Sequence, residues 1–295
     1  MNKLAIIIPY YKIGHFEDTI KSVVSQIDKR FTLYIGNDAS PDNPLPIITK
    51  YLKGQDYHYF NYKENLGGQN LAMQWERILE NVTEDWFQVL GDDDMIAENF
   101  VEEFYNILHV LPHHINLIRV NNLYFNDELK TVREGLRYKK IATTNNLLRD
   151  KIYYKTASTL SENIFRKSAF DLVGFRYYPV AWHTDDMIIL EISKFGDFYY
   201  SEKTSVKIYN GQLNLSSSNN NILEKFNASQ EFLIDLLLNY NSYLESKLIQ
   251  RYINNLYTIV NQNNFKFSIR LIYLLTVKGY IKLGCKLIKI NILNK

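Results

Sequence analysis

Three consecutive carboxylates, Asp92, Asp93 and Asp94, follow the apolar run at residues 86–90. Their like charges repel one another, so apolar packing gives no reason to place them together. A hard divalent cation does, because it takes several oxygen ligands and offsets the crowded charge. The alternative is an acidic turn or a helix N-cap, since aspartate favours both. The preceding strand-like run favours the metal, because open α/β sheets bind ligands at the carboxyl ends of their strands.

A second acidic pair, Asp185 and Asp186, lies far along the chain. An aspartate held beside a substrate hydroxyl can act as a general base. The alternative is the start of a helix predicted over residues 187–194, where acids meet the helix dipole favourably, and both interpretations can hold at once. The nearby His183 could be a ligand or a hydrogen-bond donor, although a lone histidine is more often structural.

Polar and aromatic residues after the first two predicted strands could bind a nucleotide. Asp38 follows a strand, where its carboxylate can accept hydrogen bonds from a ribose or a base, or can form an Asx-turn. Tyr10 and Tyr11 come after Pro9 and could stack on a base or pack in the core. These residue types are compatible with a nucleotide site and equally with turn formation and core packing.

Two glycines follow the third predicted strand. Gly67 and Gly68 could let the backbone approach a phosphate, or could form a plain turn after Asn65. The chain has neither a GxGxxG fingerprint nor a P-loop. The glycines alone therefore favour a turn.

Alternating strands and helices must position these residues. Short apolar runs predict strands, and apolar residues three and four apart predict amphipathic helices. The predicted strands cover residues 4–9, 31–37, 57–62, 86–90 and 116–124, and the predicted helices cover 16–27, 45–52, 69–80 and 97–108. This alternation predicts an α/β fold, a mostly parallel sheet with helices on both faces. The loops after Pro9, Asn37 and Leu90 then share the carboxyl edge of the sheet.

The second half of the chain is less regular. Residues 126–155 are polar and aperiodic, which predicts an excursion over the sheet edge. A strand and a short helix are predicted within 161–175, a further strand over 198–209 and a Ser/Asn-rich loop over 210–221. We therefore predict one domain over residues 1–221 and a helical region over 222–295.

Composition narrows the class of protein. The single cysteine, Cys285, excludes an intrachain disulfide and a zinc site built from several cysteines. The apolar run at residues 4–8 is too short for a signal peptide. No apolar run approaches the roughly 20 residues that span a bilayer. These features predict a cytoplasmic protein.

Charge is distributed unevenly. The whole chain carries a net charge of +2, yet no acid follows Glu245 and nine basic residues do. Lys278, Lys282, Lys286 and Lys289 recur on one helical face among apolar residues. That pattern favours a helix lying on an anionic membrane surface, and the alternative is packing on the first domain with solvated lysines. Nucleic-acid binding is not predicted, because the basic residues accompany no recognised binding motif.

The order and spacing of these motifs resemble the family 2 glycosyltransferases of the GT-A fold, especially bacterial enzymes that build surface polysaccharide. The resemblance covers about residues 3–218. Its segments are Ile6-Ile7-Ile8-Pro9-Tyr10-Tyr11, Asn37-Asp38-Ala39-Ser40, Asn65-Leu66-Gly67, the DXD-like segment 90–96, the segment 165–175 and Thr184-Asp185-Asp186. Three departures are Gly91 at the usual first Asp, the absence of an arginine from residues 69–73, and Gln212 where a histidine is common.

The resemblance implies a GT-A domain that binds a nucleotide sugar through about residues 1–125 and an acceptor through about 126–221, with a helical basic appendage. It implies donor binding by Pro9, Tyr10, Tyr11, Asp38, Asn65, Gly67, Asp92 and Asp93. It further implies Mn²⁺ or Mg²⁺ on Asp93 and Asp94, and catalysis by Asp186, or by Asp185. The expected reaction is inverting transfer, with a UDP-sugar as the expected donor, to a glycan or lipid-linked sugar. The resemblance implies an enzyme of polysaccharide or capsule synthesis. Such an enzyme is cytoplasmic, either free or bound peripherally to the inner face of the cell membrane.

Two other functions remain open from the sequence. A nucleotide-sugar nucleotidyltransferase should carry a Gly-rich loop and an arginine after the first strand, and residues 10–15 do not. A non-catalytic nucleotide-sugar-binding protein of the same fold would release no nucleoside diphosphate. A phosphatase with an Asp-x-Asp nucleophile is disfavoured, because that motif should end the first strand.

Overall fold

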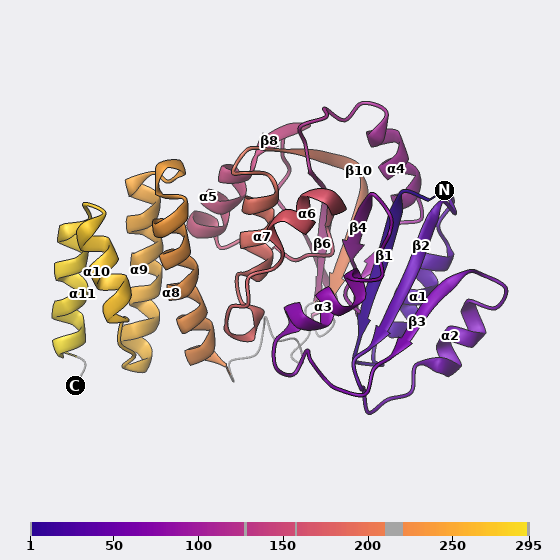
Figure 1. Cartoon of the computed structure of the whole chain (residues 1–295), viewed down its shortest axis with the longest axis horizontal. Coiled ribbons are helices and arrows are strands. Elements are labelled where there is room, and N and C mark those ends of the chain that lie inside the picture. The colour runs from indigo at the N-terminus through magenta and orange to yellow at the C-terminus, as the bar shows by residue number, and fades with distance from the viewer. Residues whose placement is uncertain (1, 127–128, 157, 210–220, 294–295) are drawn as a thin grey trace.

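The computed structural model describes residues 2–126, 129–156, 158–209 and 221–293. Strands and helices alternate through its first half (Figure 1). The strands are β1 (Leu4–Tyr10), β2 (Phe31–Asn37), β3 (Tyr57–Asn61), β4 (Trp86–Val89), β5 (Met95–Ile96) and β6 (Leu117–Asn126). The helices between them are α1 (Phe16–Val24), α2 (Leu45–Tyr51), α3 (Leu71–Leu79) and α4 (Phe100–Leu108). The predicted alternation is confirmed, with element ends shifted by a few residues.

The later elements complete the sheet and its helical covering. The strands are β7 (Thr131–Glu134), β8 (Ile141–Thr143), β9 (Asn163–Arg166) and β10 (Asp197–Tyr209). The helices are α5 (Thr144–Tyr154), α6 (Lys167–Val173), η1 (Pro179–Ala181), α7 (Thr184–Ile192), α8 (Ile222–Asn239), η2 (Asn241–Tyr243), α9 (Ser246–Asn263), α10 (Ile269–Val277) and α11 (Ile281–Leu293).

One sheet runs in the order β3-β2-β1-β4-β9-β6-β10-β5. β1 pairs in parallel with β2 and β4, β2 with β3, and β6 with β10. β9 lies antiparallel between β4 and β6, so it begins at the edge where those two strands end. The mostly parallel sheet is confirmed, and this carboxyl edge gathers residues from both halves of the chain.

Helices cover both faces of the sheet, as predicted. Side chains of β1 alternate, with Leu4, Ile6 and Ile8 packing beneath α1, α2 and α4. Ala5 and Ile7 face the opposite layer, which contains α3, α6 and α7. A strand buried on both faces needs apolar residues at successive positions, which explains the continuous run in β1.

The prediction of an irregular excursion over residues 126–155 is wrong in part. β7 pairs with β6, β8 pairs with β10, and α5 is a helix of 11 residues. The β7 side chains are all exposed, so no apolar alternation marks that strand. Only Leu148 and Ile152 give α5 a buried apolar pair, too few for a clear periodic signal. Of the predicted loop at 210–221, residues 210–220 lie outside the described part.

The C-terminal helices share a hydrophobic core with the rest of the chain. Leu148 and Ile152 of α5 and Met187 and Leu190 of α7 pack in the same cluster as residues of α8–α11. Figure 1 shows α8 to α11 side by side beyond α5 and α7, with the C-terminus at the far end. The helical region is confirmed, and it is anchored on the domain. None of the described helices has the length and apolarity to cross a bilayer.

Candidate active site

Asp92 ties together two loops at the carboxyl edge. Its Oδ2 accepts hydrogen bonds from the backbone N–H of Tyr11 at 2.7 Å and of Lys12 at 2.6 Å. Burial, with the charge of Asp93 beside it, raises the pKa of Asp92 to about 6. Asp92 therefore fixes the loop after β1 against the turn after β4.

Asp94 is the most deeply held of the three acids. The Ser161 hydroxyl donates to its Oδ2, and the backbone N–H of Tyr209 donates to its Oδ1 at 3.2 Å. Burial and the charge of Asp93 raise the pKa of Asp94 well above its ordinary value. A Cβ at Gly91 would lie 2.9 Å from Asp94 Oδ2, which explains glycine at this position. The three acids thus have different surroundings.

The acidic turn fits a metal that shares its coordination with a substrate. No group of three or more His, Cys, Asp or Glu side chains in the described ranges could enclose an ion. Protein Mg²⁺ sites, however, often use one or two carboxylates together with phosphate oxygens and water. Burial is the main cause of the raised pKa values of Asp92 and Asp94, and the negative charge of Asp93 between them is the second cause. Asp93 and Asp94 fit such a shared cation site and do not form a closed protein cage.

Asp38 organises the loop that follows β3. Its carboxylate accepts from the backbone N–H of Leu66 at 3.0 Å and of Gly67 at 2.7 Å. Arg77 of α3 forms an ion pair with it, and the Arg77 guanidinium lies over the Tyr62 ring. A Cβ at Gly67 would lie 2.7 Å from Asp38 Oδ2, so this contact requires glycine. Asp38 is only 1% exposed, so it shapes the surface of this loop from beneath.

Arg77 was missed by sequence reasoning. Family resemblance places an arginine directly after Asn65-Leu66-Gly67, and residues 69–73 contain none. Arg77 instead reaches back from the last turn of α3 to Asp38. No spacing in the sequence marks this pairing, because it depends on how α3 lies against the sheet.

The two tyrosines after Pro9 are in different environments. Tyr10 is fully buried, its ring lies 4.5 Å from that of Phe16, and its hydroxyl donates to the Asp42 carbonyl. Of the two alternatives for the Tyr10 side chain, base stacking or core packing, this position agrees with core packing. Tyr11 is 38% exposed. Of the pair, Tyr11 alone offers ring surface to a ligand.

Asp186 lies in a buried network built from four helices. Lys151 of α5 forms an ion pair with its Oδ2, and His183 Nδ1 donates to the same oxygen at 2.6 Å. His183 Nε2 lies 2.9 Å from Ser229 Oγ of α8 and 3.1 Å from the Tyr252 hydroxyl of α9. Burial opposes ionisation of Asp186, but Lys151 and His183 outweigh it and hold the pKa of this carboxyl well below its usual range. Asp186 is therefore a fixed carboxylate.

Asp185 has the opposite electrostatic character. Burial and the charge of Asp186 raise the pKa of Asp185 to about 7, with Lys151 partly offsetting them. Burial and the charges of Glu162, Asp185 and Asp94 also raise the pKa of Tyr124 on β6, although Arg119 opposes them. The electrostatic influence of both acidic pairs thus reaches the same tyrosine near the end of β6.

The raised pKa of Asp185 predicts a pH-dependent stability. The folded protein keeps this proton up to about pH 7, whereas an unfolded aspartate loses it near pH 3.9, so stability falls as pH rises through that window. Asp185→Asn removes the buried charge. We expect the melting temperature of this variant to exceed that of the wild type at about pH 8, and the difference to shrink at about pH 5. A constant difference in thermal melts across this range would contradict the assignment.

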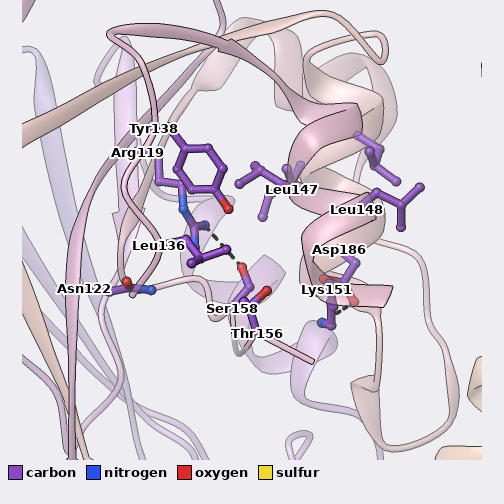
Figure 2. A pocket seen from close by; sticks show the side chains of 12 residues that line it. Arg119, Asn122, Leu136, Tyr138, Leu147, Leu148, Lys151, Thr156, Ser158 and Asp186 are labelled. Atoms are coloured by element: carbon purple, nitrogen blue, oxygen red, sulfur yellow. Dashed lines mark hydrogen bonds and ion pairs between the residues drawn. The ribbon is translucent and has the colours of Figure 1, made fainter. Parts of the chain in front are cut away.

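A cavity beside Asp186 lies between β6 on one side and α5 and α7 on the other (Figure 2). Asp186 and Lys151 lie on one wall, and Arg119 and Asn122 lie on the other. Further lining comes from the apolar and small polar side chains Leu136, Tyr138, Leu147, Leu148, Thr156 and Ser158. The cavity therefore places charged, polar and apolar side chains next to Asp186.

A buried ion pair connects this cavity with the acidic turn. Arg119 donates to Glu162 at 2.8 Å, and Asn122 donates to the same Glu162 oxygen at 3.1 Å. Glu162 is fully buried and follows Ser161, the residue whose hydroxyl contacts Asp94. This pair could not be predicted from sequence, because Arg119 and Glu162 are 43 residues apart and neither belongs to a motif.

Comparisons with known proteins identify the family and the fold of this chain. The family model described as glycosyl transferase family 2 matches residues 5–171. A crystal structure of S. aureus TarS, residues 1–349, superposes with a TM-score of 0.69 at 12% identity, covering 99% of this chain and 88% of that one. The same protein with UDP-GlcNAc gives a TM-score of 0.68 at 14% identity, covering 94% and 80%. At these identities the structural likeness establishes the fold alone. No curated protein sequence matches significantly.

Proposed function

Because the chain belongs to glycosyl transferase family 2 and is therefore a glycosyltransferase with a nucleotide-sugar donor, we propose that it uses a UDP-sugar and inverts the transferred sugar. The single observation that carries this proposal is the arrangement of its two acidic pairs. Asp93 and Asp94 lie in a crowded turn at the carboxyl edge, while Asp186 lines a cavity between α5, α7 and β6. One pair suits a diphosphate with its cation, and the other suits a hydroxyl.

The donor nucleotide would lie along the loops after β1 and β3. Asp92 and Asp38 hold these loops through backbone N–H groups, so their shape is already set before a ligand binds. Tyr11 offers an exposed ring there, and Asn65 accepts from the Gly68 N–H within the same loop. Structures of the similar TarS fold in complex with UDP-GlcNAc and with UDP support a uridine nucleotide.

A divalent cation, Mn²⁺ or Mg²⁺, would be held by Asp93 and Asp94 together with the donor phosphates. When bound, it supplies positive charge that stabilises the departing diphosphate. Ser161 and the Tyr209 N–H orient Asp94 for this task. A fixed second layer of this kind typically strengthens metal binding.

Asp186 would take the proton from the acceptor hydroxyl. It lines the cavity, and both of its hydrogen-bond partners, Lys151 and His183, lie on Oδ2 and hold it ionised. A base on the acceptor side and a leaving diphosphate on the other allow a single in-line displacement, which inverts the anomeric centre. Asp185, with a pKa near 7, is the alternative base.

We propose a glycan or a lipid-linked sugar as the acceptor, in surface-polysaccharide or capsule synthesis. The charged side chains Arg119, Lys151 and Asp186 around the cavity support an acceptor that presents hydroxyl groups. A lipid-linked acceptor would require the enzyme to work at the inner face of the cell membrane, as a peripheral protein.

A screen of nucleotide sugars tests this function. With Mn²⁺ present, we expect one UDP-sugar to yield UDP, slowly with water and faster with an acceptor glycan, and we expect chelation to suppress release. Nuclear magnetic resonance of the product should show the anomeric configuration opposite to that of the donor. Pyrophosphate release would indicate a nucleotidyltransferase, and a lack of release with every donor would indicate a binding protein.

A further inference from the structure

The last two helices expose apolar side chains that nothing in the described part of the chain covers. We call α10 and α11 together the terminal hairpin. Ile269 and Tyr273 of α10 are 83% and 64% exposed, and Ile281 and Ile292 of α11 are 57% and 62% exposed. The hairpin is tightly packed, since a Cβ at Gly284 would lie 2.6 Å from Thr276 Oγ1. The exposed apolar residues therefore lie on the surface of two closely packed helices.

Apart from Leu293 at the last position of the helix, the exposed apolar residues of α11 form a stripe, which consists of Ile281, Cys285, Ile288 and Ile292. At about 100° per residue they fall within an arc of roughly 60°. Gly284, Leu287 and Ile290 are the buried residues of the helix, and they lie outside this arc. The stripe therefore faces away from the core.

Lysines flank the stripe on one side. Lys282, Lys286 and Lys289 occupy the next arc of α11, and Lys278 precedes the helix. Residues 246–295 contain no acid, although residues 1–245 carry 32 acids against 25 basic residues. An apolar stripe beside a lysine flank is the pattern of a helix that lies in the interface of an anionic bilayer.

We propose that the terminal hairpin docks on an anionic lipid surface, with the α11 stripe inserted among the acyl chains and the lysines at the headgroups. A second copy of the chain fits less well. A two-fold interface joins the same patch from both subunits, and residues 246–295 contain no acid that could pair with the lysines of the other copy. The purpose of the docking, access to a lipid-linked acceptor, rests on the proposed function, whereas the docking itself does not.

Vesicle co-sedimentation of the full chain tests the docking. We expect binding to vesicles of phosphatidylcholine with one third phosphatidylglycerol at low salt, release at high salt, and little binding to phosphatidylcholine alone. Lys278→Gln/Lys282→Gln/Lys289→Gln should weaken binding about a hundredfold, since each lysine near such a surface contributes about fivefold. Lys286 is left unchanged because it donates to Asn254.

Two further variants sharpen the result. Ile281→Ser/Ile288→Ser/Ile292→Ser should also abolish vesicle binding, while circular dichroism and UDP release with a soluble acceptor stay at wild-type values. Lys3→Gln/Lys53→Gln/Lys194→Gln removes the same charge from exposed positions of the domain over residues 1–221 and should bind like the wild type.

Equal loss of binding in this control would overturn the proposal, as would a wild-type protein that ignores anionic vesicles. A dimer in light scattering that the isoleucine variant dissolves would assign the stripe to a second copy instead. Because UDP release is measured separately with a soluble acceptor, failure of the docking and failure of the glycosyltransferase assignment are distinguishable.

Discussion

Asp186→Asn is expected to lower kcat by about a thousandfold, because a positioned general base contributes roughly 10²–10⁴ in rate. Asparagine keeps the shape of the side chain and can still accept from His183, but it cannot take a proton. The proposed donor site lies on the loops after β1, β3 and β4, so the dissociation constant for UDP should remain close to the wild-type value. Single-turnover transfer and calorimetric UDP binding measure the two quantities separately.

The folding of this variant needs its own control, because Asp186 balances a buried charge. Without the carboxylate, Lys151 would remain largely buried without its partner, at a cost of about 3–5 kcal/mol. The double variant Lys151→Met/Asp186→Asn removes both charges. We expect it to recover the melting temperature and to stay inactive. Recovered activity in the double variant would show that Asp186 acts by neutralising Lys151 and that the base lies elsewhere.

Asp185→Asn is the matched control variant for Asp186→Asn. It makes the same chemical change one residue earlier in the first turn of α7. We expect kcat within about tenfold of the wild type, because the base itself is retained. If instead Asp185→Asn loses a thousandfold and Asp186→Asn does not, Asp185 is the base.

The first half of the fold was predictable because each element there has its own local signal. β1 and β4 are short apolar runs, and α1 and α3 bury one face, so periodicity identified them before any tertiary contact was known. α5 lacked such a signal, since its buried residues depend on contacts with α7 and α9. Lys151 was therefore missed along with the helix that carries it.

The candidate site was predictable only where acids cluster in sequence. Asp92, Asp93 and Asp94 are adjacent, but their different roles depend on partners from distant segments, such as Tyr11 and Ser161. A lone His183 gave no indication that Ser229 and Tyr252 would join it to the C-terminal helices. Motif spacing can place a carboxylate at the end of a strand, but it cannot tell how the carboxylate is solvated or paired.

Asp93→Asn/Asp94→Asn is expected to lose at least about a hundredfold in Mn²⁺-dependent UDP affinity, because a metal at a phosphate contributes several kcal/mol. With chelator present, the variant and the wild type should bind UDP equally. The same change should raise the melting temperature at neutral pH. Burial and the charge of Asp93 hold the pKa of Asp94 far above normal, so neutral amides relieve a repulsion that the metal-free protein must bear.

Asp92→Asn is the control for this pair, and the contrast decides whether the three acids are unequal. Its carboxylate accepts from the Tyr11 and Lys12 N–H groups, and an asparagine oxygen can still do so. We therefore expect Asp92→Asn to keep the Mn²⁺ dependence and to lose only a few-fold in UDP affinity. If Asp92→Asn abolishes the metal effect while the double variant keeps it, then Asp92 binds the cation, and the buried contacts of Asp94 with Ser161 and Tyr209 serve only to fix the turn after β4. If Asp93 and Asp94 hold the cation, the double variant should show both a higher melting temperature and the loss of Mn²⁺-dependent UDP affinity.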